Sequence, residues 1–237
     1  MLQLGYLSLT AAVCLVLIYF GFIVINKSYF ESERKKKKAY LIIGILLWQL
    51  YLGIIGSSDF ILSYSFPPRF ALTMIVPAFI FTGIFVYRNR KADWLLHLPT
   101  KQIFLFQSFR ILVESLFVAS FAAGILHKEA TIEGYNFDMI YALTVPIIGL
   151  VAISGPKLNL KLLRSWNYLG LIVLATVVFV FMTSIYKPGL YGSSEPILPL
   201  EAITYPYGLV AGCLMPIAVF MHVLSIAHLN RLIKKEK

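Results

Sequence analysis

Charged residues are scarce in this sequence: Asp, Glu, Lys and Arg together make up 14% of its 237 residues, while 59% are hydrophobic. Soluble domains usually carry about 25% charged and about 45–50% apolar residues. The shortage of charge therefore excludes an ordinary soluble domain. It predicts an all-α polytopic membrane protein with one transmembrane bundle domain over residues 1–237.

Cysteine is also rare, and both copies, Cys14 and Cys213, fall inside apolar segments. Neither is placed for a disulfide outside the membrane or for a metal site, so two small buried side chains are expected. His222 and His228 are six residues apart and lie on different faces of a helix, which argues against a chelating pair. We therefore expect no metal and no other cofactor.

Several catalytic motifs are missing as well. The sequence has no P-loop, no nucleophile elbow and no HExxH zinc signature. The last apolar segment contains no lysine, which excludes the retinal-linked lysine of a microbial rhodopsin. The sequence therefore carries no signature of a particular reaction.

Long apolar runs, by contrast, are plentiful. A membrane-spanning helix needs about 20 mostly apolar residues. The first run has no basic stretch before it, which predicts an uncleaved helix and not a signal peptide. Seven segments are long enough to be expected spans: 4–26, 39–58, 69–87, 103–124, 138–154, 165–185 and 207–229.

Basic residues gather in alternate connections. Of the 21 Lys and Arg residues, 17 fall in four stretches, 27–38, 88–102, 155–164 and 230–237. Cytoplasmic loops carry such an excess, so the pattern predicts an external N-terminus and a cytoplasmic C-terminus. The net charge of +10 is then a sign of topology, and no nucleic-acid partner is expected.

One apolar segment contains ionisable residues, in the stretch FQSFRILVES at 106–115. Arg110 and Glu114 are four residues apart and Gln107 precedes Arg110 by three, so all lie on one helix face. At 1.5 Å per residue, Arg110 lies roughly 12 Å and Glu114 roughly 18 Å from the cytoplasmic border. A charge at such depth costs at least about 2.5–3.5 kcal/mol, so we expect both to face the bundle interior.

Two other expected helices carry polar residues at a similar depth. His222 lies roughly 12 Å from the cytoplasmic end of the seventh, with Ser225 on the same face, and Gln49 lies roughly 15 Å into the second. Either Arg110 and Glu114 pair with one another and fix helix packing, or Arg110 holds an anionic group such as a carboxylate or phosphate while Glu114 or His222 exchanges protons. The matching depths predict one polar layer made of Gln49, Gln107, Arg110, Glu114 and His222.

Polar residues near the external ends form a secondary group of candidates. Asp138 follows Asn136 in GYNFD and is expected to cap the fifth helix at the outer mouth. Glu195 lies in the longest external loop, 186–206, whose Pro and Gly content suits either a lid over a cavity or a stiff connector.

Proline lies inside three of the expected helices. Pro77, Pro146 and Pro216 are each found about 8–9 residues into a span that runs from outside to inside. Because proline removes a backbone hydrogen bond, we expect each helix to bend there.

Four stretches carry a resemblance: QSFRILVES, GYNFDMIYALTVP, WNYLG and TYPYG…MPIAVFMHVLS, in this order between residues 95 and 228. They resemble a group of bacterial seven-span integral membrane proteins with no known activity. The resemblance implies a multi-pass protein of the bacterial inner membrane. The residues that it marks are Arg110, Glu114, Asn136, Asp138, Asn167, Glu195 and His222.

Three functional hypotheses follow from the sequence. The first is a transporter-like or receptor-like bundle that binds a small anionic or amphipathic, lipid-like molecule between the fourth and seventh helices. The second is a membrane-embedded enzyme that acts on a lipid or isoprenoid with Glu114 or His222 as acid or base. The third is a structural or assembly protein, and the oligomeric state is left open.

Overall fold

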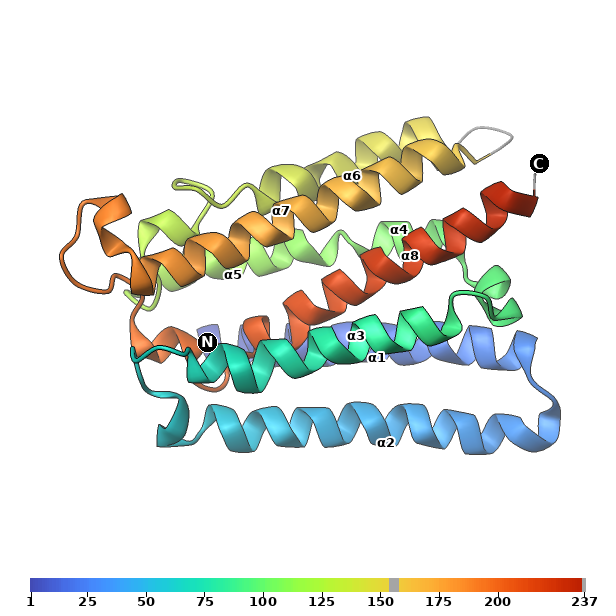
Figure 1. Cartoon of the computed structure of the whole chain (residues 1–237), viewed down its shortest axis with the longest axis horizontal. Coiled ribbons are helices and arrows are strands. Elements are labelled where there is room, and N and C mark those ends of the chain that lie inside the picture. Colours follow the sequence, from blue (N-terminus) through green and yellow to red (C-terminus); the bar gives the residue numbers. More distant parts are fainter. Residues whose placement is uncertain (154–157, 236–237) are drawn as a thin grey trace.

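The protein is described by a computed structural model that covers residues 1–153 and 158–235. The chain is 80% helical, and these ranges contain no strand (Figure 1). The last residue of the expected fifth span, 154, and two residues of the basic count, Lys157 and Lys237, lie outside the described ranges. The expected all-α fold is confirmed.

Helices long and apolar enough to cross a membrane make up most of the structure. Shorter helical segments connect them: η1 Asp59–Ile61, η3 Asp93–His97, η4 Lys128–Ala130, η5 Pro188–Tyr191 and η6 Leu200–Ile203. Helix α6, Asp138–Ile153, has 16 residues and is shorter than each of the six long apolar segments. The six long apolar segments are α1 Leu2–Ser28, α2 Glu31–Gly56, η2 Ala71–Ile75 with α3 Val76–Asn89, α4 Thr100–Phe106 with α5 Phe109–Ala122, α7 Leu160–Tyr186, and η7 Val210–Leu214 with α8 Met215–Lys235.

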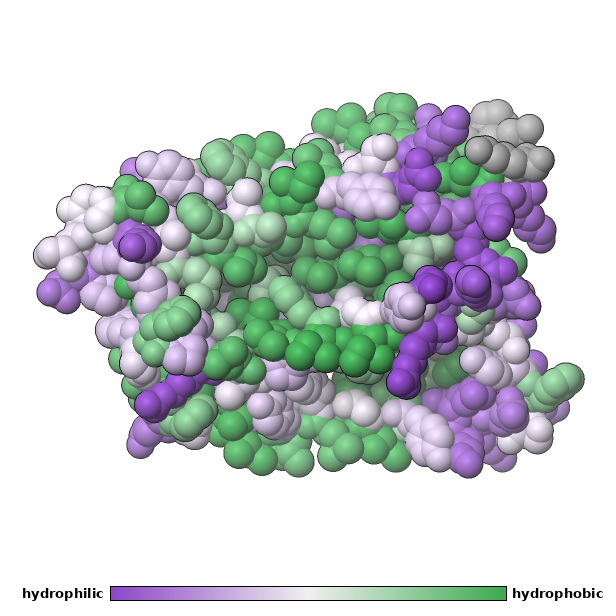
Figure 2. All heavy atoms as spheres, viewed as in Figure 1, coloured by the Kyte–Doolittle hydropathy of each residue, from purple (hydrophilic) through white to green (hydrophobic). Residues whose placement is uncertain are grey.

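The helices lie roughly alongside one another in a bundle (Figure 1). Helix α8 packs against α7 and α3, α6 packs against α5 and α7, and α2 lies at the edge beside α1. The face in Figure 2 is hydrophobic across its middle and hydrophilic toward its ends. We call the end with the N-terminus, residues 123–137 and residues 187–209 the loop end. The other end, with the C-terminus, is the basic end.

Two helices differ from the predicted bounds: one begins earlier than expected, and the other is interrupted. Helix α2 begins at Glu31 and not at residue 39, so the KKKK run at 35–38 belongs to its first turns and not to a loop. The expected continuous helix 103–124 is interrupted between α4 and α5. There the N–H groups of Gln107 and Ser108 bond to carbonyls three residues back, Phe104 at 3.2 Å and Leu105 at 3.1 Å. This tight, 3-10-like turn separates Gln107 from the regular helix that carries Arg110.

Two of the three prolines follow π-helical segments. Pro77 and Pro216 each occupy the second position after η2 and η7, respectively. A proline has no N–H for the carbonyl four residues before it. Those carbonyls accept side-chain bonds from α2 instead: Tyr51 Oη donates to Thr73 O at 3.0 Å, and Trp48 Nε1 donates to Gly212 O at 3.0 Å.

The two aromatic donors stack on one another with ring centroids 5.2 Å apart. Trp48 and Tyr51 of α2, both half-buried, therefore bond to one backbone carbonyl in each of the two π-helical segments. Pro77 and Pro216 thus follow π-helical segments, whereas α6 continues through Pro146 as one helix, and the bend expected at each proline stays a prediction.

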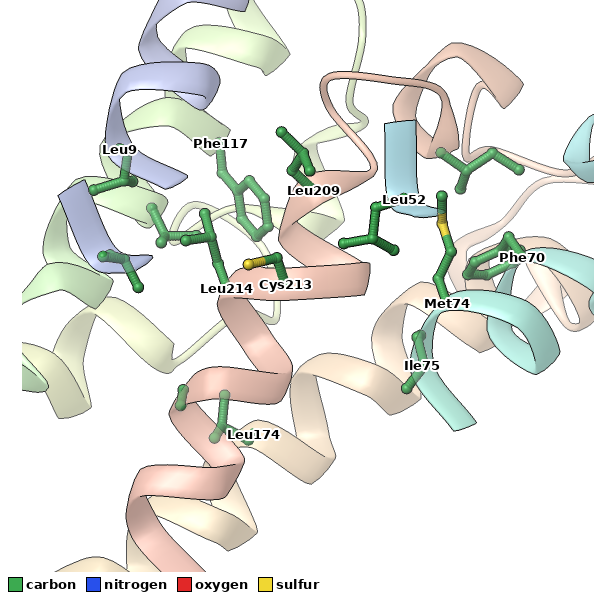
Figure 3. Close-up of a cluster of buried hydrophobic side chains, with 14 of the residues drawn as sticks. Leu9, Leu52, Phe70, Met74, Ile75, Phe117, Leu174, Leu209, Cys213 and Leu214 are labelled. Carbon is green, nitrogen blue, oxygen red and sulfur yellow. The ribbon is translucent and has the colours of Figure 1, made fainter. Parts of the chain in front are cut away.

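The largest hydrophobic core lies where η2 and η7 meet. Figure 3 shows Cys213 and Leu214 between Leu52 on one side and Phe117 on the other, with Met74 and Phe70 beyond Leu52. Each of these side chains is buried, and they come from helices distant in sequence. This packing fixes the position of η7, and hence the start of the helix that carries His222.

Candidate functional site

Arg110 is the centre of a buried polar cluster. It is 1% exposed, and its ion-pair partner is Asp138, the first residue of α6. Arg110 Nε donates to Asp138 Oδ2 at 3.0 Å, and a second bond joins Nη2 to Oδ1. The two-bonded arrangement is the strong form of a guanidinium–carboxylate pair. Asp138 therefore lies buried in the bundle beside Arg110, and not at an outer mouth as the sequence predicted.

His222 on α8 is bonded through both ring nitrogens. Its Nε2 lies 2.9 Å from Arg110 Nη1 and its Nδ1 lies 2.8 Å from Asn167 Oδ1. Because a guanidinium only donates, Nε2 is the acceptor and carries no proton. Asn167 uses its Nδ2 on the Leu163 carbonyl at 2.7 Å, so its oxygen accepts from Nδ1. His222 is thus held as the neutral tautomer with its proton on Nδ1.

Glu114 does not pair with Arg110, although both lie on one face of α5. Its carboxyl accepts from Asn136 Nδ2, at 3.1 Å to Oε1 and 2.9 Å to Oε2. The same nitrogen donates to the Ala130 carbonyl at 2.9 Å, and Asn136 Oδ1 accepts from the Asp138 N–H at 3.0 Å. The GYNFD turn thus holds both acidic residues of the cluster. The Arg110–Glu114 ion pair, one of the two arrangements that the sequence left open, is not found among the described residues.

Aromatic residues that the sequence analysis missed form the floor of the cluster. The Arg110 guanidinium lies 4.6 Å from the centre of the Tyr141 ring, in a cation–π contact. Tyr141 stacks on Trp166 at 4.5 Å and donates from Oη to the Trp166 carbonyl at 2.8 Å. Sequence spacing could have indicated Tyr141, because it follows Asp138 by three residues and lies on the same face of the helix.

The other predicted residues lie apart from the cluster. Gln49 Nε2 points at the two cysteines, 3.5 Å from Cys14 Sγ and 3.1 Å from Cys213 Sγ. Gln107 is buried, and within the described ranges neither its Oε1 nor its Nε2 has a hydrogen-bond partner. Ser225 is buried on α8, and Glu195 is exposed in the loop before η6. Four members of the predicted layer are buried, then, but only Arg110, Glu114 and His222 belong to this cluster.

The cluster opens onto a cavity of about 30 Å³ that Arg110, Glu114 and Asp138 line together. A second cavity of about 60 Å³ continues toward the loop end, with walls that are almost entirely apolar. Tyr6 and Tyr207 lie among the residues around it. The two cavities are adjacent because they share four lining residues: Phe117, Val177, Val210 and Met215.

Comparison of the chain with protein-family models, with curated proteins and with solved structures gave no match. Within residues 1–153 and 158–235, no three His, Cys, Asp or Glu side chains are grouped as metal ligands would be. What the site can do is therefore derived from its own geometry.

Proposed function

We propose that the chain crosses a bacterial inner membrane seven times, with its N-terminus outside and its C-terminus in the cytoplasm. Six long apolar helices support a multi-pass membrane protein. At 1.5 Å per residue, the 16 residues of α6 extend about 24 Å of an apolar layer about 30 Å thick, so α6 is the seventh crossing only together with the residues next to it. The alternation of basic connections supports this orientation.

We further propose a transporter-like or receptor-like protein that binds a small amphipathic molecule inside the bundle. The observation that carries this proposal is the pair of adjacent, mainly apolar cavities, the smaller of which has Arg110, Glu114 and Asp138 in its wall. Binding sites in helical bundles are mostly apolar, with a few polar groups that orient the ligand. In this arrangement the apolar part of the ligand lies against Phe117 and Val177, and its polar end reaches Arg110 and Glu114.

The cluster favours a ligand whose polar end donates hydrogen bonds. Arg110 already uses three of its five N–H groups on protein, at Nε and Nη2 with Asp138 and at Nη1 with His222, and its charge is paired with Asp138. Glu114 and Asp138, in contrast, bring acceptor oxygens to the cavity. Hydroxyl and amine groups therefore fit this site better than the anionic group that the sequence alone allowed.

Co-purification tests the proposal. The wild type, Val177→Phe, Glu114→Gln and Ser184→Ala would be purified in native lipid, and their bound small molecules identified by mass spectrometry. Val177 lines both cavities, whereas Ser184 is buried on the same helix and lines neither. We expect an amphipathic molecule with the wild type and Ser184→Ala, and its loss from the other two variants. An identical set of molecules in all four preparations would refute the proposal.

A further inference from the structure

Charge balance singles out Glu114 within the cluster. Two carboxyl groups, Glu114 and Asp138, face one guanidinium, Arg110, and the ion pair joins Arg110 to Asp138. His222 cannot supply a second positive charge while Arg110 donates to its Nε2, because a protonated imidazole has no acceptor. An ionised Glu114 would therefore leave the buried cluster with an uncompensated negative charge, which is costly in an apolar layer.

The neighbours of Glu114 do little to solvate that charge. Asn136 has two amide hydrogens and uses its nitrogen on the Ala130 carbonyl as well as on both Glu114 oxygens. One N–H thus remains for a carboxylate that can accept about four hydrogen bonds. The carboxyl group is therefore under-coordinated on the side that faces the cavity.

Among the described residues that line this cavity, Arg110 is the only cation. Helices α7, η7 and α8 present only apolar side chains to the cavity, among them Leu174, Leu214 and Ala218. On α1, the Tyr6 hydroxyl lies 2.6 Å from Ser120 Oγ, and Tyr6 lines the adjacent apolar cavity. No second cation faces Glu114 from the described residues, so a proton or a cationic ligand must balance its charge.

We propose that Glu114 carries a proton when the cavity is empty and exchanges it for the ammonium group of a small amphipathic amine. This inference rests on the proposed binding function and names its ligand class. On binding, the Glu114 O–H bond breaks, the proton leaves to water, and the ammonium N–H groups bond to the resulting carboxylate. Total charge in the site is conserved, because one proton is replaced by one monovalent cation.

The exchange makes binding depend on pH in a defined direction. The empty site holds one proton that the occupied site lacks, so a rise in pH favours binding. While Glu114 stays protonated in the empty protein, the Kd for the amine should fall about tenfold per pH unit. A neutral alcohol of the same length would bind without this dependence, and a carboxylate would add to the negative charge.

Two measurements on the full chain in lipid nanodiscs test the inference. Infrared spectroscopy of the ligand-free protein should show the C=O stretch of a protonated carboxyl, which Glu114→Gln removes and Val177→Phe keeps. Calorimetric titration with n-butylammonium in two buffers of different ionisation enthalpy should give one proton released per bound amine, while n-butanol releases none. Glu114→Asp keeps a carboxyl, and serves if Glu114→Gln does not fold.

The outcomes separate this inference from the binding function. If butylammonium binds without proton release, or if the infrared band is absent, proton exchange at Glu114 is wrong while a binding cavity remains. If the band is present but neither butylammonium nor n-butanol binds, the protonated site stands and the cavity does not accept small amphipathic molecules. Proton release that persists in Glu114→Gln would place the exchange on another group and overturn the assignment.

Discussion

Arg110 on α5 and Asp138 on α6 form a buried ion pair through two hydrogen bonds, across 28 residues of sequence. The pair connects α5 and α6, which pack side by side. Glu114, which is much nearer to Arg110 in sequence, is left to Asn136. The charge of the Asp138 carboxylate is therefore neutralised by Arg110, whereas the Glu114 carboxyl has only an amide partner.

The first prediction concerns the cost of breaking this pair. Asp138→Asn leaves the Arg110 charge buried without its partner, which should lower the free energy of unfolding by about 3–5 kcal/mol. Replacing both residues, as in Arg110→Met with Asp138→Leu, removes the unpaired charge and should cost less than Asp138→Asn alone. Equilibrium unfolding in mixed micelles measures both. A double variant less stable than Asp138→Asn would contradict the neutralising role of the pair.

The second prediction uses Gly170 on α7, which faces the same cluster. A Cβ there would overlap the Tyr141 hydroxyl and the His222 ring. Gly170→Ala should therefore displace both side chains and destabilise the protein by about 1–3 kcal/mol, as overpacking does. Gly53→Ala on α2 is the matched control, since no atom lies within 4 Å of its added Cβ.

For Gly53→Ala we expect an unchanged or higher stability, by up to about 1 kcal/mol, because alanine is the better helix former. Thermal unfolding of the two variants in the same detergent gives the comparison. Equal stability of Gly170→Ala and the wild type would show that the Tyr141 and His222 side chains can move aside at no cost.

The third prediction concerns the carbonyls that the prolines leave unpaired. Tyr51→Phe removes the donor to Thr73 O and should cost about 1 kcal/mol. In a Pro77→Ala background, the new backbone N–H offers that carbonyl another partner, so Tyr51→Phe should cost about 0.5–1 kcal/mol less. A double-mutant cycle measures this coupling.

Trp48 and Pro216 offer a parallel cycle around Gly212 O, at the second π-helical segment. Similar coupling in both cycles is expected, because the two sites have the same geometry. Additive effects in both would mean that α2 does not replace the missing backbone bonds.

Much of the helical framework could be predicted from the sequence, because apolar composition over about 20 residues is a local property. The burial of Arg110, Glu114 and His222 could be predicted too, since a charge or imidazole in an apolar layer must face the interior. These inferences need only the depth of a residue and the cost of exposing it to lipid.

The partners of these residues could not be predicted in the same way. The depth of a residue in the membrane does not say which neighbouring helix its side chain faces. Equal depth grouped Gln49 with Arg110, although Gln49 faces Cys14 and Cys213. Asp138 was assigned to the outer border because each helix was assumed to begin there. In the structure the turn at 131–137 packs back onto α5 through Asn136, which brings Asp138 to Arg110. That placement depends on contacts between distant segments, and no local pattern encodes it.

The last prediction concerns His127, in the connection between α5 and α6. Neither ring nitrogen has a hydrogen-bond partner among the described residues, and burial lowers the pKa of His127 from 6.5 to about 4. The unfolded chain then binds a proton more readily than the folded chain between these two values. Stability should therefore be complete above about pH 6.5 and fall as the pH drops toward 4.

The size of the His127 effect is limited by partial solvent access to this connection. We expect a loss of about 1–2 kcal/mol between pH 7 and pH 4, which His127→Phe should abolish. His97 at the basic end is the matched control: it is exposed and bonded to Ser28 Oγ at 2.8 Å, so His97→Phe should leave the pH dependence in place. Thermal unfolding of the three proteins across this pH range measures the effect. A slope that survives in His127→Phe would assign the pH dependence to another group.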